Sequence, residues 1–148
     1  MEPAATIANA LGVVLTRGFR SGLYGSVTLG VAPGQTEANY PVLSALARAG
    51  EPRSAAALAP DLGLDRSVVS RRAAELVRAG LVVQVPDPDD RRQALLTLTP
   101  SGIDAIAEAR RRLEAVIADH TSTWTEADRE ALARLLSRFT ATPLASTE

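Results

Sequence analysis

Residues 54–98 read SAAALAPDLGLDRSVVSRRAAELVRAGLVVQVPDPDDRRQALLTL, and this stretch decides the fold. The alanine-rich run after Ser54 predicts a short helix, because serine caps helix N-termini and Gly63 provides a helix stop. After Asp65, a second N-cap residue, residues 66–79 repeat apolar side chains at helical spacing. Two short helices joined by a tight Leu-Gly-Leu segment predict a helix-turn-helix unit.

The second of these predicted helices has two chemically different faces. One face carries an apolar stripe, which we expect to be buried. The other carries hydroxyl and guanidinium groups near the N-terminal end, and the major groove of DNA accepts such groups. A solvated face without a ligand is the alternative. The expected buried stripe is Val69, Ala73, Leu76 and Val77, and the expected DNA-binding residues are Arg66, Ser67, Ser70 and Arg71.

The next residues predict a β-hairpin. β-branched and aliphatic side chains at 81–85 and 94–98 favour two strands, and the proline- and aspartate-rich segment 86–93 favours a tight tip. A helix-turn-helix unit followed directly by a hairpin is a winged helix. If the tip is extended, Asp90 and Arg92 point the same way, so we expect the carboxylate to hold the guanidinium in one orientation. A turn held by its own salt bridge, without a role in DNA binding, is the alternative.

Helical patterns precede this region. Residues 4–20 predict one helix, whereas residues 21–35 are rich in Gly, Ser and Thr and fit either a loop or a short irregular helix. The next helix is expected to be capped by Thr36 or Asn39 and to end at Gly50.

Helical patterns also follow the hairpin. Thr99 followed by proline is a strong helix start, because an N-cap residue precedes proline at the first helical position. We expect this helix over 100–119. Its three consecutive arginines, 110–112, are expected on a solvated face, paired with Glu108 and Glu114 or with a partner chain. A last helix is expected from Thr125, with aspartate in the place of the capping-box glutamate.

Both flanking regions present broad apolar faces. A helix of this kind near the end of a chain needs a partner for its apolar face. We expect mutual burial across a two-fold axis, although packing within one monomer is the alternative. The predicted fold is mainly α with a small β-hairpin wing: a single domain, 1–148, with dimerisation helices at 4–35 and 100–140 around a winged helix-turn-helix region, 36–99. The apolar faces are Ile7, Leu11, Val14, Leu15 and Phe19, and Leu132, Leu135, Leu136 and Phe139.

The composition limits the function. The chain has 148 residues, of which 46% are hydrophobic and 22% charged, as is usual for one globular domain. It has no cysteine and one histidine, which excludes disulfides, thiolate metal sites and thiol redox sensors. No nucleophile with a base, carboxylate pair or metal cluster can be assembled, so we expect no enzyme, no catalytic residue, no metal and no cofactor. Without an apolar run of about 18 residues, we expect a cytoplasmic protein with no membrane segment.

The cations are uniform in kind. All 16 are arginine, although the formal net charge is −1. The planar, multi-donor head of arginine suits phosphates and guanine edges, and high-GC coding is the plain alternative explanation. Residues 48–92 contain eight arginines and seven acids, a net charge of +1, against −2 for the rest of the chain. We therefore expect a moderate DNA binder that relies on dimerisation and depends steeply on salt.

The motifs form the ordered series Leu58-Ala59, Leu62-Gly63-Leu64, Ser70-Arg71, Leu76, Gly80-Leu81-Val82, Asp87-Pro88-Asp89-Asp90-Arg91-Arg92 and Leu96-Thr97-Leu98-Thr99-Pro100-Ser101-Gly102. This series resembles the MarR family of transcriptional regulators, the multiple antibiotic resistance regulators. The resemblance implies a triangular homodimer in which each winged helix reads half of a pseudo-palindrome, with small-molecule regulation in many members. It also implies that Ser70 and Arg71 face the groove, that Arg92 enters a narrow minor groove, and that Arg91 contacts phosphate.

Three features depart from the family pattern. Pro60 removes a backbone donor within the first helix of the helix-turn-helix and is expected to shorten or kink it. Pro41 is unusual for its helix and fits only in the first turn. The lack of cysteine excludes peroxide sensing through a thiol.

The sequence thus predicts a sequence-specific double-stranded DNA-binding transcriptional regulator, a homodimeric repressor on a pseudo-palindromic operator, released by a small-molecule effector. The alternative is a winged-helix protein–protein interaction module without DNA binding, which would more often expose apolar residues on the helix at 66–79. An effector pocket is expected where the dimerisation helices meet the winged helix. Its candidate residues are the amphipathic rings of Tyr24, Tyr40, His120 and Trp124.

Overall fold

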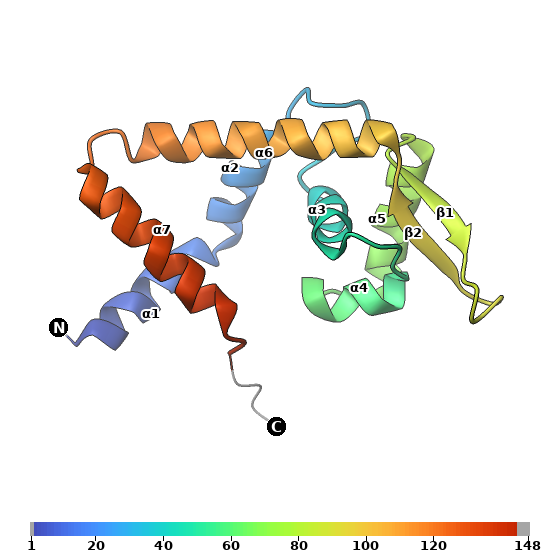
Figure 1. The fold of residues 1–148 in the computed structure, drawn as a ribbon, viewed down its shortest axis with the longest axis horizontal. Coiled ribbons are helices and arrows are strands. Elements are labelled where there is room, and N and C mark those ends of the chain that lie inside the picture. Colours follow the sequence, from blue (N-terminus) through green and yellow to red (C-terminus); the bar gives the residue numbers. More distant parts are fainter. Residues whose placement is uncertain (1, 145–148) are drawn as a thin grey trace. The chain divides into compact units, whose positions relative to one another are not determined.

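Seven helices and one two-stranded hairpin make up residues 2–144, the part of the chain that the computed structural model describes (Figure 1). The predicted fold class, mainly α with a β-hairpin wing, is confirmed. The chain divides into two compact units, one up to Leu113 and the other from Glu114. The elements are α1 (Pro3–Val14), α2 (Arg17–Thr28), α3 (Tyr40–Ala49), α4 (Ala55–Leu62), α5 (Arg66–Arg78), β1 (Val82–Pro86), β2 (Ala94–Leu98), α6 (Pro100–His120) and α7 (Glu126–Ala141).

An apolar stripe seats α5 in the core of the first unit. Val69, Ala73 and Leu76 are each at most 3% exposed, and Val77 packs beside them, as the sequence predicts. Their spacing of three to four residues places them on one side of the helix. Burial of a valine or leucine side chain contributes about 1.5–3 kcal/mol. The stripe therefore fixes the rotation of α5 about its axis.

A tight turn joins α4 to α5. Gly63 has φ +61°, a left-handed conformation that glycine adopts without strain. Its N–H donates to the carbonyl of Pro60 (3.2 Å), and the N–H of Leu64 donates to the carbonyl of Ala59 (3.1 Å), the bond pair of a Schellman motif. Pro60 lies inside α4 and does not end it. Asp65 is the N-cap residue of α5 as predicted, but its carboxylate accepts no capping hydrogen bond.

Asn39 is the N-cap residue of α3, one of the two predicted, but its side chain makes no capping bond to the helix and instead pairs with Thr36 in the turn before it. The side-chain oxygen of Asn39 accepts the N–H of Thr36 (2.9 Å), and the hydroxyl of Thr36 accepts the N–H of Asn39 (3.2 Å). Asn39 is fully buried, and its amide also donates to the carbonyl of Gly34 (2.8 Å). Pro41 lies in the first turn of α3, as the sequence requires, where its missing N–H is not needed.

The hairpin is antiparallel, with Val82 paired to Leu98, and its strands lie within one residue of the predicted ranges. Leu96 also exchanges two backbone hydrogen bonds with Arg53, at 3.0 and 2.7 Å. This bridge was not predicted from the sequence. It ties the segment before α4 to the wing and so anchors the hairpin to the helix-turn-helix unit.

The prediction of one helix over residues 4–20 is wrong, because two helices, α1 and α2, meet within this segment. Thr16 makes the break. Its hydroxyl donates to the carbonyl of Val13 (2.8 Å) and accepts the N–H of Phe19 (3.3 Å), which is the geometry of an N-cap. α2 then continues through its glycines to Thr28, so the first part of the segment that fitted either a loop or a helix is helical.

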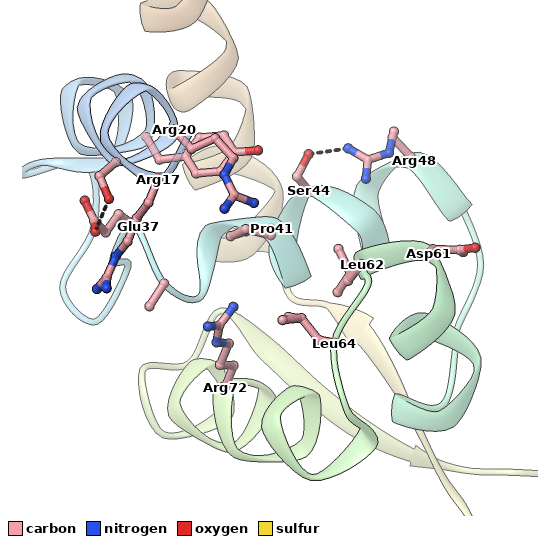
Figure 2. A pocket seen from close by; sticks show the side chains of 13 residues that line it. Arg17, Arg20, Glu37, Pro41, Ser44, Arg48, Asp61, Leu62, Leu64 and Arg72 are labelled. Carbon is pink, nitrogen blue, oxygen red and sulfur yellow. Dashed lines mark hydrogen bonds between the residues drawn. The ribbon is translucent and has the colours of Figure 1, made fainter. Parts of the chain in front are cut away.

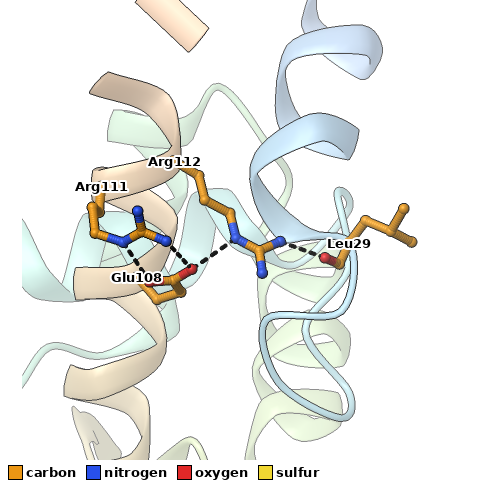
Figure 3. A network of polar contacts seen from close by, with 4 residues as sticks. All are labelled: Leu29, Glu108, Arg111 and Arg112. Carbon is orange, nitrogen blue, oxygen red and sulfur yellow. Dashed lines mark hydrogen bonds and ion pairs between the residues drawn. The ribbon is translucent and has the colours of Figure 1, made fainter. Parts of the chain in front are cut away.

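A polar network joins α6 to the end of α2 (Figure 3). The carboxylate of Glu108 accepts bonds from Arg111 (2.8 Å) and Arg112 (2.9 Å), and Arg112 also donates to the backbone carbonyl of Leu29 (2.5 Å). The hydrogen bonds from Arg111 and then Arg112 lower the pKa of Glu108 to about 2. The predicted pairing with Glu108 is confirmed for Arg111 and Arg112, whereas Arg110 and Glu114 form no ion pair among residues 2–144. The bond from Arg112 supplies a donor to a carbonyl at a helix end.

The second unit contains α7, which starts with the predicted capping pattern. The hydroxyl of Thr125 accepts the N–H of Asp128 (3.1 Å) and donates to its carboxylate (2.6 Å). No residue of α7 is buried, and the same holds for α1 in the first unit. None of the helices within residues 2–144 combines the length and the apolar character needed to span a lipid bilayer.

Thr99 starts α6 where two backbone segments approach closely. Its hydroxyl accepts the N–H of Gly102 (3.0 Å) and donates to the carbonyl of Gly80 (2.7 Å), so one side chain caps α6 and ties it to the chain after α5. Gly102 is buried, and a Cβ atom at this position would lie 2.0 Å from the carbonyl oxygen of Leu81. Glycine is therefore required for α6 to pack this close to the entry of the wing.

The variant Gly102→Ala tests this contact. The added methyl group would meet backbone that cannot rotate away, so we expect the free energy of unfolding to fall by about 1–3 kcal/mol, as at overpacked sites. Gly22→Ala is the matched control, because Gly22 also lies in a helix but a Cβ there would meet nothing within 4 Å. This control should be neutral or stabilising by up to about 1 kcal/mol. Chemical denaturation measures both, and equal stability of the two variants would contradict the close contact.

Candidate nucleic-acid interface

The outward face of α5 carries the residues predicted to bind DNA. Arg66, Ser67, Ser70 and Arg71 are all exposed. Ser67 and Arg71 lie opposite the buried stripe and Ser70 lies beside it, whereas Arg66 occupies the first position of the helix, before the stripe begins. Neither arginine of this group forms an ion pair within residues 2–144. The 13 residues of α5 span about 20 Å, at ~1.5 Å per residue. A helix of this size with free guanidinium groups fits the major groove of B-DNA.

A hollow of about 160 Å³, here called the wing groove, lies between α5, the start of α4 and the hairpin. It brings together three predicted residues, Arg66 and Ser70 from α5 and Arg92 from the wing. Gln84 and Gln93 also line it, and neither was among the predicted residues. Gln84 could have been found from the sequence, because it is a polar residue within an otherwise apolar predicted strand. Ser67, Arg71 and Arg91 do not line the wing groove.

Two aspartates organise the tip of the wing through the backbone. The carboxylate of Asp90 accepts the N–H of Arg92 (3.0 Å). One carboxylate oxygen of Asp87 accepts the N–H of Asp89 (2.9 Å), and the other accepts the side-chain amide of Gln93 (3.1 Å). The bond from the Asp89 N–H is the main cause that holds the pKa of Asp87 below its usual value.

This arrangement corrects the expected contact between Asp90 and the guanidinium of Arg92. The chain turns at residues 91–92 and is not extended there, so the carboxylate meets the backbone N–H and not the side chain. The exposed guanidinium groups of Arg91 and Arg92 form no ion pair in the described part of the chain. Asp90 thus shapes the loop that presents both arginines.

The four predicted effector-pocket residues lie in different places. Tyr24 lines a hollow of about 470 Å³ between α2, α3, α4 and α5 (Figure 2), here called the arginine pocket. Tyr40 is 5% exposed and packs against Tyr24, with ring centroids 5.2 Å apart. His120 and Trp124 belong to the second unit, are exposed, and do not line this pocket. Among residues 2–144, no three His, Asp or Glu side chains gather as a metal site needs.

A helix-turn-helix unit whose second helix presents free arginines beside a β-hairpin defines a winged helix-turn-helix protein. Comparison with known proteins agrees with this class. Residues 34–93 match the model of the MarR family. A protein of Thauera aromatica, assigned to transcriptional regulation of the hcr operon, is 32% identical over 127 residues. That match covers 86% of this chain and 66% of the relative, just under two thirds of its length. The chain is thus similar to the MarR family over its winged helix-turn-helix region.

Two solved structures share the fold over nearly the whole chain. RV1404 from Mycobacterium tuberculosis is 27% identical, with a TM-score of 0.73 over 98% of this chain and 97% of that one. Wild-type MarR from E. coli, in its apo form, is 20% identical, with a TM-score of 0.74 over 94% of this chain and 98% of that one. The winged helix with additional helices on both sides is therefore the fold of the chain.

Asp90→Ala tests the role of this carboxylate at the tip of the wing. Loss of a hydrogen bond worth about 1 kcal/mol should speed amide exchange of Arg92 roughly fivefold. Asp89→Ala is the control, because the Asp89 carboxylate accepts no hydrogen bond from the residues that the structure describes. Hydrogen exchange followed by NMR measures the Arg92 amide in both variants. An unchanged rate in Asp90→Ala would rule out the backbone role.

Proposed function

We propose that this protein regulates transcription by binding double-stranded DNA in a sequence-specific manner. The outward face of α5 carries the proposal, because four polar side chains lie exposed there, beside the wing and without competing ion pairs. In the proposed complex, α5 enters the major groove and the tip of the wing reaches the adjacent minor groove. The match of residues 34–93 to the MarR family model and the assignment of the Thauera relative to transcriptional regulation support this function.

The proposed contacts are of two kinds, those that specify sequence and those that fix position. Arg71 makes a bidentate contact to a guanine edge, and Ser70 contacts a neighbouring base. Arg92 enters a narrow minor groove, and Arg91 binds a phosphate. The remaining contacts, to bases or backbone, come from Arg66 and Ser67.

The proposed active form is a homodimer, with residues 4–35 and 100–140 as its dimerisation helices. Exposed apolar surface is unfavourable in water by about 25 cal/mol per Å². A second copy covers this surface through the same helices, as two-fold symmetry requires. The exposed side chains, between 41% and 66% accessible, are Ile7, Val14, Leu15, Phe19, Leu132, Leu135, Leu136 and Phe139.

The dimer sets the form of the proposed operator. Two copies of α5 related by a two-fold axis bind two half-sites of a pseudo-palindrome, about one helical turn apart. Occupation of such a site blocks transcription, so we propose a repressor, released when a small molecule changes the spacing of the two α5 helices. We place this activity in the cytoplasm and assign the chain no enzymatic role.

A winged helix that binds only other proteins is the second function considered for this fold. Such a module would be expected to expose apolar or aromatic residues at the centre of its contact surface. The outward positions of α5 carry arginine and serine instead, and no observation on the described residues favours this second function.

Arg71→Ala and Arg91→Ala distinguish the two kinds of proposed contact. Loss of a bidentate base contact should reduce the discrimination between operator and random duplex by about 1–3 kcal/mol in Arg71→Ala. Arg91→Ala should weaken binding to both duplexes alike and make the dependence on salt less steep. Fluorescence anisotropy with labelled duplexes measures both effects, and each variant serves as the control for the other. Normal operator binding by both variants would show that these residues are wrongly assigned.

A further inference from the structure

The arginine pocket collects four arginines from three helices of the first unit. Arg17 and Arg20 come from α2, Arg48 from α3 and Arg72 from α5. Figure 2 shows the guanidinium groups of Arg20 and Arg72 directed from opposite sides toward the space beside Pro41. A volume of about 470 Å³ lies within the range of small-molecule sites.

The charge of this pocket is not balanced from within. Glu37 and Asp61 also line it, so four arginines and two carboxylates give a formal net charge of +2. Within residues 2–144 none of the four arginines forms an ion pair. Glu37 accepts a bond from the hydroxyl of Ser21 (3.0 Å), and Arg48 donates to the hydroxyl of Ser44 (2.7 Å). The four guanidinium groups thus retain unused donors, and those of Arg20 and Arg72 face a common space.

We infer that the arginine pocket binds a small molecule that carries phosphate, with at least two negative charges. Guanidinium groups bind phosphate oxygens through paired, charge-assisted hydrogen bonds. A single carboxylate can engage at most two of the four arginines and balances one of the two excess charges. Pro41, Leu62 and Leu64 add apolar surface to the pocket, which suits an organic part of the ligand.

The position of the pocket gives this ligand a route to the proposed DNA-binding face. Arg72 is the neighbour of Arg71 in α5, whereas Arg17 and Arg20 lie in α2, among the proposed dimerisation helices. A polyanion held by both helices would draw α5 toward α2 and change how α5 meets the groove. This regulatory role rests on the proposed function, whereas binding of the ligand does not. The DNA backbone is the alternative occupant of the pocket. A concave site with apolar lining suits a small molecule better than it suits the DNA backbone.

Isothermal titration of the full chain with sodium pyrophosphate, at constant ionic strength, tests the inference. We expect saturable binding that is at least tenfold tighter than that of sodium benzoate, a monoanion. Arg20→Gln and Arg72→Gln should each weaken pyrophosphate binding by about tenfold or more, because each removes a charge-assisted contact. Arg110→Gln, an exposed arginine outside the pocket, should bind as the wild type does. Circular dichroism tests whether each variant is folded. If Arg20→Gln or Arg72→Gln is unfolded, Arg17→Gln is measured in its place.

The outcomes separate this inference from the proposed function. Non-saturable binding of pyrophosphate, equal affinity for benzoate, or equal losses in Arg110→Gln would overturn the inference. If pyrophosphate does not bind and Arg20→Gln instead loses affinity for random duplex DNA, the pocket is part of the DNA surface and the inference fails. Saturable pyrophosphate binding by a chain that binds no duplex DNA would uphold the inference and reject the proposed function.

Discussion

Val69, Ala73 and Leu76 hold one side of α5 in the core, and the proposed function depends on this burial. A helix has one free rotation about its axis, and three apolar side chains on one face remove it. The residues on the opposite face are then exposed to solvent, whichever side chains they carry. Arginine and serine at those positions are exposed and form no ion pair among residues 2–144, so these side chains are available for binding. The same seating leaves Arg72 on a third side, at the arginine pocket.

The wing keeps its place by contacts on both of its sides. Arg53 pairs through its backbone with Leu96 in the middle of β2, and Thr99 bonds both Gly80 and Gly102 at the end of the hairpin. These contacts hold the base of the wing, whereas the tip depends on short bonds from two aspartates to nearby backbone N–H groups. The tip is thus shaped locally, and its arginines remain free to meet a ligand.

Local signals in the sequence predicted most of this fold. Apolar periodicity gave α5, β-branched runs gave the hairpin, and the Thr-Pro pair gave the start of α6. The break at Thr16 was missed, because the apolar spacing continues across it while a single hydroxyl decides it. The Arg53 bridge and the arginine pocket join residues distant in sequence, which no local pattern encodes. Asp90 was expected to meet a side chain, but a backbone N–H lies nearer when the chain turns.

Selection of bound duplexes from a random DNA library tests the central claim most directly, since it requires no operator in advance. We expect enrichment of an inverted repeat whose half-sites are centred about one helical turn, ~10–11 base pairs, apart. Recovery of duplexes without a common sequence, or of a single half-site without its mate, would contradict a pair of α5 helices that reads DNA.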